Sequence, residues 1–416
     1  MKRLFFLQVL IGLLIIETGT VFAGKKTIPS YNLENEVVRK YMAKGPYDGF
    51  GSADSYFSDN AEFPQKYAQD KPQHITLTWE GDTTRTYTVT LADARTGFKR
   101  PVLQEKVQGT SLDITNLIPQ KQYIYKIQCQ QKKIKSGAFR TEGQVRMLDI
   151  DNCCNARDLG GWTGLDGRII RYGWLYRSGS IDGEYTGVGS DNCGGSRCTH
   201  PNHVAAQTQV GDPAKYILHD SSVKALAQIG ILADMDLRGM TDEGRWGNQC
   251  MAHTRSLGQT KIPDAAFRQI MTDEALYNPL KDPAVVQDVA WIIQELKEGH
   301  PVVFHCRSGA DRTGAVAMLI EALLGVSAGD IARDYELTSL SSEGRGQTRS
   351  AKSALTSSYG FFAKGFTTLD VPATDPTERL QQQSYAYLNS FFENDSISKE
   401  DLDWFINFML IRPETI

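Results

Sequence analysis

The spacing of hydrophobic residues changes character along this chain, and the first regular pattern lies between residues 71 and 144. Here apolar and polar positions alternate in short runs separated by Gly, Asp and Pro residues, most clearly at 75–79, 86–91, 111–114 and 123–127. Alternation with a period of two is typical of strands that bury one face. A series of such strands joined by turns predicts a small all-β sandwich.

From residue 147 onwards, short apolar runs alternate with longer stretches of helical period. Helical patterns cover about 222–230 and 283–298, and strand-like runs cover about 231–238 and 302–304. Strands that alternate with helices predict an α/β fold. We therefore expect helices to flank a mostly parallel sheet, with a site at the carboxyl ends of the strands.

This second domain is expected to extend over 147–412. Two stretches interrupt its pattern, a glycine- and cysteine-containing one at about 182–218 and a Ser-, Gly- and Thr-rich one at about 340–380. We interpret the earlier stretch as an insertion and the later one as an insertion or a lid. Near the end of the chain, Ser398 precedes an acidic first turn, which predicts a capped amphipathic helix.

The first 70 residues divide into two segments. Residues 1–23 begin Met-Lys-Arg, continue with an apolar core and end Val-Phe-Ala, which is typical of a secretory signal peptide. An uncleaved membrane anchor is the alternative. We expect an exported protein, periplasmic or secreted, with no stable membrane span after signal removal. Residues 24–70 form a lead-in with one short helix around 34–42.

Composition narrows the possible partners. The chain has 416 residues, 41% of them hydrophobic, and a formal net charge of −4. Its Lys and Arg residues are scattered and form no basic stripe, so we expect no nucleic-acid partner.

The stretch at 301–316 carries the candidate chemistry: it reads Pro-Val-Val-Phe-His-Cys-Arg-Ser-Gly-Ala-Asp-Arg-Thr-Gly-Ala-Val. A buried strand precedes Cys306, and a buried helix with a glycine at its end follows Arg312. A tight loop at a helix N-terminus directs several N–H groups and partial positive charge into one concavity. Arg312 can hold two phosphate oxygens, and the same field lowers the pKa of the Cys306 thiol. The pattern predicts a nucleophilic thiolate beside bound phosphate.

Each further residue of this loop has an expected task. Gly309 permits a turn where a Cβ would intrude, and the Thr313 hydroxyl is placed to steady the thiolate as it leaves. The phosphate-binding set is expected to be Arg307, Ser308, Gly309, Ala310, Asp311 and Arg312.

The loop resembles the Cys-x5-Arg signature of the protein tyrosine phosphatase superfamily. Its form is similar to that of bacterial tyrosine phosphatases, a group that includes dual lipid and protein phosphatases. Four other motifs resemble the same family: Asn155-x-Arg-Asp-Leu-Gly-Gly, Tyr176-Arg-Ser-Gly, Asp-Leu-Arg238 and Asp334-Tyr-x-Leu.

The resemblance implies hydrolysis of a phosphomonoester through a phosphocysteine intermediate, without a metal or cofactor. It also implies supporting roles for His305, Thr313, Arg157, Asp158, Arg177 and Arg238. We expect Arg157, Asp158 and Arg177 to be buried charges that need partners, with direct substrate contact as the alternative.

The β-rich segment resembles a fibronectin type III module. Trp79 and the sequence Leu117-Ile-Pro-Gln-Lys-Gln-Tyr123, with its expected tyrosine corner, carry this resemblance. Such modules act as spacers or docking surfaces, so we assign no chemistry to it; carbohydrate binding is the minor alternative.

Three aspartates are candidates for the general acid that protonates the leaving group. Asp311 lies inside the loop, where the bacterial family is thought to keep its acid. Asp264 follows a proline upstream of the cysteine, where a mobile loop would carry an acid, and Asp236 ends a neighbouring strand. We rank them in that order.

The motifs allow more than one class of phosphorylated substrate. Arg307 supplies one basic residue, but Ala310 stands where a second lysine is common in the lipid-phosphatase version of the loop. Fewer positive charges favour a phosphotyrosine protein or peptide over a lipid headgroup or another phosphorylated small molecule. The remaining alternatives are a phosphoinositide or inositol phosphate phosphatase and a catalytically silent phosphate-binding or adhesive module.

Seven cysteines are compatible with disulfides in an exported protein. With Cys306 kept as a free thiol, six remain, and we favour a pair between Cys193 and Cys198. His200 and His203 follow at spacings that would also suit zinc, which is the alternative.

Overall fold

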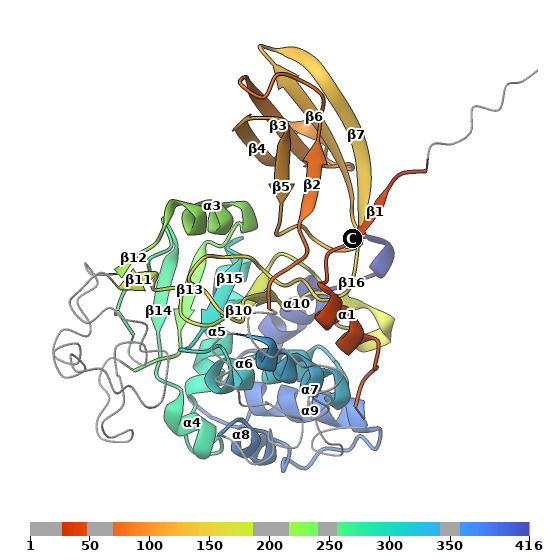
Figure 1. Ribbon diagram of the computed structural model, residues 1–416. Helices are drawn as coiled ribbons and strands as arrows, with labels where there is room; N and C mark the ends of the chain where they lie inside the picture. The colour runs from red at the N-terminus through yellow and green to blue at the C-terminus, as the bar shows by residue number, and fades with distance from the viewer. Residues whose placement is uncertain (1–26, 48–69, 186–215, 240–255, 342–357, 416) are drawn as a thin grey trace, which may run out of the picture.

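The computed structural model describes residues 27–47, 70–185, 216–239, 256–341 and 358–415 (Figure 1). The expected signal peptide, the four Cys and His residues of the predicted disulfide or zinc loop, and Cys250 lie outside these ranges. No helix in the described part has the length and apolar composition needed to cross a bilayer.

The N-terminal β-rich region consists of a five-stranded sheet in the order β1-β7-β6-β3-β4 and a two-stranded sheet, β2-β5. The bounds are β1 (Ser30–Asn32), β2 (Ile75–Thr78), β3 (Thr86–Asp93), β4 (Pro101–Gln108), β5 (Ser111–Ile114), β6 (Gln122–Cys129) and β7 (Lys132–Glu142). The four alternating runs are confirmed as strands. The hydroxyl of Tyr123 accepts the N–H of Ile118 at 3.0 Å, the contact expected of a tyrosine corner.

The second region is built on a five-stranded sheet in the order β14-β13-β15-β10-β8. The bounds are β8 (Arg157–Asp158), β10 (Leu175–Ser178), β13 (Ala233–Asp236), β14 (Ala266–Gln269) and β15 (Val302–His305). All neighbours pair in parallel except β8, which is antiparallel to β10. Every residue of β10, β13 and β15 is buried, as expected for parallel strands covered on both faces. The predicted α/β class is confirmed.

The helices of this region lie around the sheet (Figure 1). They are α3 (Asp220–Ile229), α4 (Asp273–Tyr277), α5 (Ala284–Lys297), α6 (Asp311–Leu323), α7 (Ala328–Glu336), α8 (Ser358–Phe366), α9 (Pro376–Asn389) and α10 (Lys399–Met409). Helices α5 and α6 contact the strands of the sheet directly. All residues of α6 from Thr313 to its end are buried, because α4, α5, α7, α8 and α9 surround it. The loop between β15 and α6 is therefore held by a buried strand on one side and a helix that is buried beyond its first two residues on the other.

Parts of the two expected insertions are described. The short strands β11 (Glu184–Tyr185) and β12 (Tyr216–Ile217) pair antiparallel across the first. In the second, Phe362 and Phe366 of α8 are buried, and their ring centroids lie 6.1 and 6.2 Å from that of Tyr387 in α9. This part of the expected lid belongs to the helical layer.

The lead-in segment joins the two regions. β1 pairs in parallel with β7 of the sandwich, and α1 (Glu36–Met42) follows directly. Val38 and Tyr41 of this helix are fully buried in the same core as α6, and the Tyr41 hydroxyl donates to Glu336 of α7 at 2.7 Å. At the C-terminal end, β16 (Leu410–Ile411) pairs with β9 (Ile169–Ile170).

Candidate active site

Cys306 lies at the carboxyl edge of the central sheet, immediately after β15. Helix α6 begins at Asp311, so residues 306–310 form a short loop that ends at a helix N-terminus. Cys306 is 3% exposed, whereas Arg312, in the first helical turn, is partly exposed. The strand, loop and helix predicted around these two residues are present.

The environment of Cys306 lowers the pKa of its thiol. Burial alone would raise this pKa, but the nearby Arg312 guanidinium and the hydroxyl and N–H groups of Thr313 outweigh burial. The negative charge of Asp311 acts in the opposite direction and is the smallest of these influences. The balance favours a thiolate, which is the reactive form of cysteine.

The loop backbone is held from outside by side chains of two earlier segments. The Nδ2 group of Asn155 donates to the carbonyl oxygens of Ser308 and Gly309, at 3.0 and 2.9 Å. Nη2 of Arg177 also donates to the Gly309 carbonyl, at 2.9 Å. Gly309 has φ +63°, and a Cβ there would lie 2.4 Å from the carbonyl oxygen of Ser178. Only glycine fits this turn beside β10.

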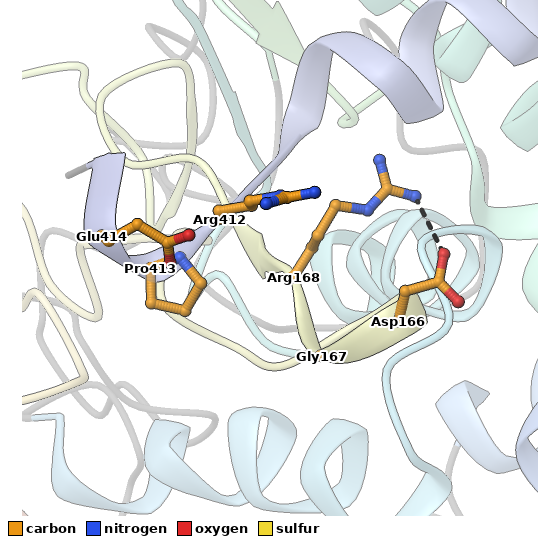
Figure 2. A pocket seen from close by; sticks show the side chains of 6 residues that line it. All are labelled: Asp166, Gly167, Arg168, Arg412, Pro413 and Glu414. Carbon is orange, nitrogen blue, oxygen red and sulfur yellow. Dashed lines mark ion pairs between the residues drawn. The ribbon is translucent and has the colours of Figure 1, made fainter.

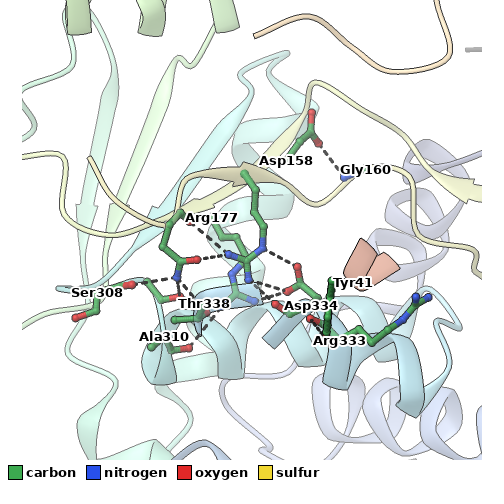
Figure 3. Close-up of polar contacts among 12 residues, drawn as sticks. Tyr41, Asp158, Gly160, Arg177, Ser308, Ala310, Arg333, Asp334 and Thr338 are labelled. Carbon is green, nitrogen blue, oxygen red and sulfur yellow. Dashed lines mark hydrogen bonds and ion pairs between the residues drawn. The ribbon is translucent and has the colours of Figure 1, made fainter. Parts of the chain in front are cut away.

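Figure 3 shows the buried network behind the loop. Asp334 of α7 accepts hydrogen bonds from Nε of Arg157, at 2.8 Å, and from Nη1 of Arg177. Arg157 also donates to Oδ1 of Asn155. Burial acts to raise the pKa of Asp334, but the two guanidinium groups prevail and lower it. The carboxylate of α7 thus compensates two buried cations that support the loop.

Asp158, although adjacent to this network, has a different task. Its carboxylate accepts hydrogen bonds from Arg146 and from the N–H groups of Gly160 and Gly173, each at 2.8 Å. It therefore shapes the turn around β8 and β10, because its three donors all lie outside the loop at 306–310.

His305 precedes the cysteine and is buried beside a carboxylate. Its Nε2 lies 3.0 Å from Oδ1 of Asp234, and its Nδ1 lies 3.3 Å from the carbonyl oxygen of Cys306. Burial acts to lower the imidazole pKa, but Asp234 and Asp236 raise it to about 9. The ring is thus a cation that fixes the backbone at the base of the loop.

Arg238 is fully buried between two carboxylates. Its guanidinium donates to both oxygens of Asp182, at 2.7 and 2.8 Å, and to both oxygens of Asp236, at 2.8 Å each. The opposing charges raise its pKa although burial acts to lower it. Arg238 ties the end of β13 to the segment after β10.

The three candidate acids occupy different positions. Oδ1 of Asp311 accepts a hydrogen bond from the Tyr335 hydroxyl at 2.7 Å, and the side chain is partly exposed beside the loop. Asp236 is buried, and the charge of Arg238 lowers its pKa to about 2 although burial acts to raise it. Asp264 precedes β14 and is exposed. Since β14 runs in the same direction as β13 and β15, Asp264 lies at the opposite edge of the sheet from Cys306.

Comparison with known proteins identifies the fold that carries this loop. The model of the tyrosine phosphatase family matches residues 148–187 and 211–403, which is more than half of the chain. This chain belongs to the tyrosine phosphatase family. The interruption of the match falls within the first expected insertion, and the β-rich N-terminal region lies outside it.

A second comparison finds that this phosphatase is similar to a protein of Cupriavidus necator named "Putative tyrosine-protein phosphatase". It is 25% identical over 204 residues, which cover 45% of this chain and 61% of the relative. The chain thus spans about three fifths of that protein's length.

A surface pocket of about 560 Å³ lies away from the phosphatase loop (Figure 2). Its walls are Asp166, Gly167, Arg168, Arg412, Pro413 and Glu414. The preceding residue, Leu165, donates its N–H to the carbonyl oxygen of Leu324, just past the far end of α6. A helix of this length spans about 20 Å, so the pocket plays no part in the chemistry at Cys306.

One group of potential metal ligands occurs among the described residues, namely Glu295, Glu298 and His300. It lies where α5 leads into β15, at the amino edge of the sheet. It is therefore remote from the phosphatase loop.

Several partners in the site were not predicted. Asp334 belongs to a motif noted in the sequence, but nothing there indicated that it pairs with Arg157 and Arg177. The contact of Tyr335 with Asp311 was missed for the same reason. Both depend on how α7 packs, which sequence spacing alone does not determine.

Proposed function

We propose that this protein hydrolyses phosphate monoesters through a phosphocysteine intermediate, with phosphotyrosine proteins or peptides as its substrates. The observation that carries the proposal is the lowered pKa of the buried Cys306 thiol beside Arg312, at a loop that ends at a helix N-terminus. A thiolate in such a position faces an anion site, which suits an oxyanion of phosphorus.

In the first step, the Cys306 thiolate attacks phosphorus and the bond from phosphorus to the tyrosine oxygen breaks. Arg312 and the loop N–H groups hold the other phosphoryl oxygens. Asp311 gives its proton to the departing phenolate. We prefer Asp311 because Asp236 is held ionised by Arg238 and Asp264 lies at the other edge of the sheet.

In the second step, water attacks the phosphorus of phosphocysteine and the sulfur–phosphorus bond breaks. The Asp311 carboxylate accepts the proton of the water, and inorganic phosphate leaves. The hydroxyl of Thr313, which already lowers the pKa of the thiol, stabilises the departing thiolate.

The charge around the loop supports a phosphotyrosine substrate over a phosphoinositide. Arg307, the basic loop residue beside Cys306, is only 8% exposed, and Ala310 contributes no charge. The loop itself therefore presents few accessible cations to a polyanionic headgroup. Inositol phosphates remain the alternative substrate class.

Turnover of p-nitrophenyl phosphate by the full chain tests the proposal. We expect inhibition by vanadate, no dependence on added metal or on chelator, and complete loss of turnover in Cys306→Ser. Cys129→Ser, which changes a buried thiol of the sandwich, is the matched control and should retain activity. Vanadate binding without turnover in the wild type would instead indicate a catalytically silent module.

The substrate class is tested by comparing kcat/KM for phosphotyrosine peptides and soluble inositol phosphates side by side. Higher values for the peptides are expected. A clear preference for inositol phosphates would overturn the substrate assignment and leave the phosphocysteine mechanism intact.

A further inference from the structure

Asn155 lies just before β8, far from Cys306 in sequence, yet its side chain contacts the phosphatase loop. It is 1% exposed and its backbone has φ +54°, in the left-handed region. Its N–H donates to Oδ2 of Asp70 at 2.6 Å. The residue is thus fixed by its own backbone before its side chain reaches the loop.

The orientation of the Asn155 amide is determined by its partners. Oδ1 accepts a hydrogen bond from Arg157, which is itself held by Asp334 at 2.8 Å. Nδ2 faces the carbonyl oxygens of Ser308 and Gly309 and, at 3.1 Å, the hydroxyl oxygen of Thr338. A flipped amide would bring its oxygen against the two carbonyl oxygens and its NH2 group against a guanidinium. Only one orientation satisfies the network.

This orientation sets the direction of two peptide groups. The C=O and N–H of one peptide unit point in opposite directions, because the unit is planar and trans. When Asn155 draws the Ser308 and Gly309 carbonyls outward, the N–H groups of Gly309 and Ala310 must point away from Asn155, towards the concave side of the loop. A rotated peptide would present a carbonyl oxygen there and would repel an anion.

We infer that Asn155 is a positioning residue that holds the loop in its anion-binding conformation. The inference rests on the proposed function, because it assigns Asn155 to the same phosphate site. Asn155 would act through the backbone, by directing the Gly309 and Ala310 N–H groups at the phosphoryl oxygens and by keeping the loop, with the Thr313 N–H that lowers the Cys306 pKa, in place.

The test is Asn155→Gly in the full chain, since glycine keeps the left-handed backbone without strain and removes only the side chain. Three quantities are measured: the pH dependence of Cys306 alkylation by iodoacetamide, followed on the peptide that contains it; the Kd of vanadate; and kcat for a phosphotyrosine peptide. We expect alkylation to shift to higher pH, vanadate to bind about 10- to 100-fold more weakly, and kcat to fall about 100-fold or more.

Asn116→Gly is the matched control. Asn116 is also buried with a positive φ, of 59°, and its side chain also holds backbone, by accepting the Asp149 N–H at 2.7 Å. It lies in the sandwich region. This variant should lower Tm while leaving Cys306 alkylation and vanadate affinity at wild-type values.

Asn155→Asp provides a second variant of nearly the same size, in which an acceptor replaces the NH2 donor. Asn155→Asp should raise the pKa of the Cys306 thiol further than Asn155→Gly does. If Asn155→Gly does not fold, the same three quantities are measured on Asn155→Asp. A lowered Tm with unchanged alkylation profile and vanadate Kd would show that Asn155 is merely structural and would overturn the inference. Alkylation and vanadate binding are independent of turnover, so a failure of the proposed reaction would be seen separately in the wild type.

Discussion

Replacing Asp311 by asparagine removes the proton that the proposed mechanism delivers to the leaving phenolate, and keeps nearly the same shape. The Tyr335 hydroxyl lies 2.7 Å from Oδ1, and this hydrogen bond can persist to the amide oxygen. Loss of a positioned general acid costs about 10²- to 10⁴-fold in rate. We expect a loss of this size in kcat for a phosphotyrosine peptide.

The structure provides a quantitative reason to choose Asp311 over Asp236. With a pKa of about 2, Asp236 is protonated in only about one molecule in 10⁴ at pH 6. Because so few molecules would carry the proton, the rate lost in this way would equal the rate that general acid catalysis provides. Asp236→Asn should therefore weaken the contact with Arg238 and lower Tm, with equal effects on all substrates.

The assay compares kcat for substrates whose leaving groups differ in acidity. A p-nitrophenolate departs without assistance, so Asp311→Asn should lose much less rate on p-nitrophenyl phosphate than on a phosphotyrosine peptide. Asp236→Asn is the control and should show no such difference. The reasoning is refuted if the dependence on leaving group appears in Asp236→Asn and is absent from Asp311→Asn.

The remaining predictions concern stability. Asp334→Asn should destabilise the protein by about 3 kcal/mol, measured by urea unfolding, because the buried guanidinium groups of Arg157 and Arg177 lose their compensating charge; an unchanged midpoint would contradict this. The pKa of His305 is raised from an ordinary 6.5 to about 9, so protonated His305 contributes about 3 kcal/mol of stability below pH 6.5, which is lost as pH rises to 9. The stability difference between wild type and His305→Gln should accordingly shrink over that range, and a difference independent of pH would rule out the charged imidazole.

The strand and helix around Cys306 were predictable because the strand, and the helix from Thr313 onwards, are buried on every side. Val302, Val303 and Phe304 form a continuous apolar run, and α6 beyond Thr313 is apolar on all sides except at Glu321. Such segments can be predicted without knowing which face of the strand or helix is buried. Their order along the chain then determines which residues lie in the loop between them.

Edge strands were harder to predict. Half of the residues of β4 are exposed, and no residue of β14 is fully buried, so neither has a clear apolar period. The missed β14 had a further consequence. Without its direction, the position of Asp264 relative to Cys306 could not be deduced.

The contacts of the site with distant segments could not be derived from spacing. Asn155 and Ser308 are 153 positions apart, and Arg177 and Asp334 are 157 apart. The first pair joins two loops, and the second joins β10 to α7, at the same edge of the sheet. The motifs indicated which residues mattered, whereas only the fold indicates what each one holds.

The β-rich region is connected to the phosphatase-family region at two points, one before β2 and one after β7. Glu34, next to β1, accepts the N–H groups of Gln144 and Val145, at 2.7 and 2.9 Å, so the chain enters and leaves the sandwich side by side. Helix α1, which lies between β1 and β2 along the chain, packs in the core of the phosphatase-family region. A region connected at both ends to the same body has less freedom to rotate than one connected at a single point, so the β-rich region is expected to keep a narrow range of orientations relative to the phosphatase-family region.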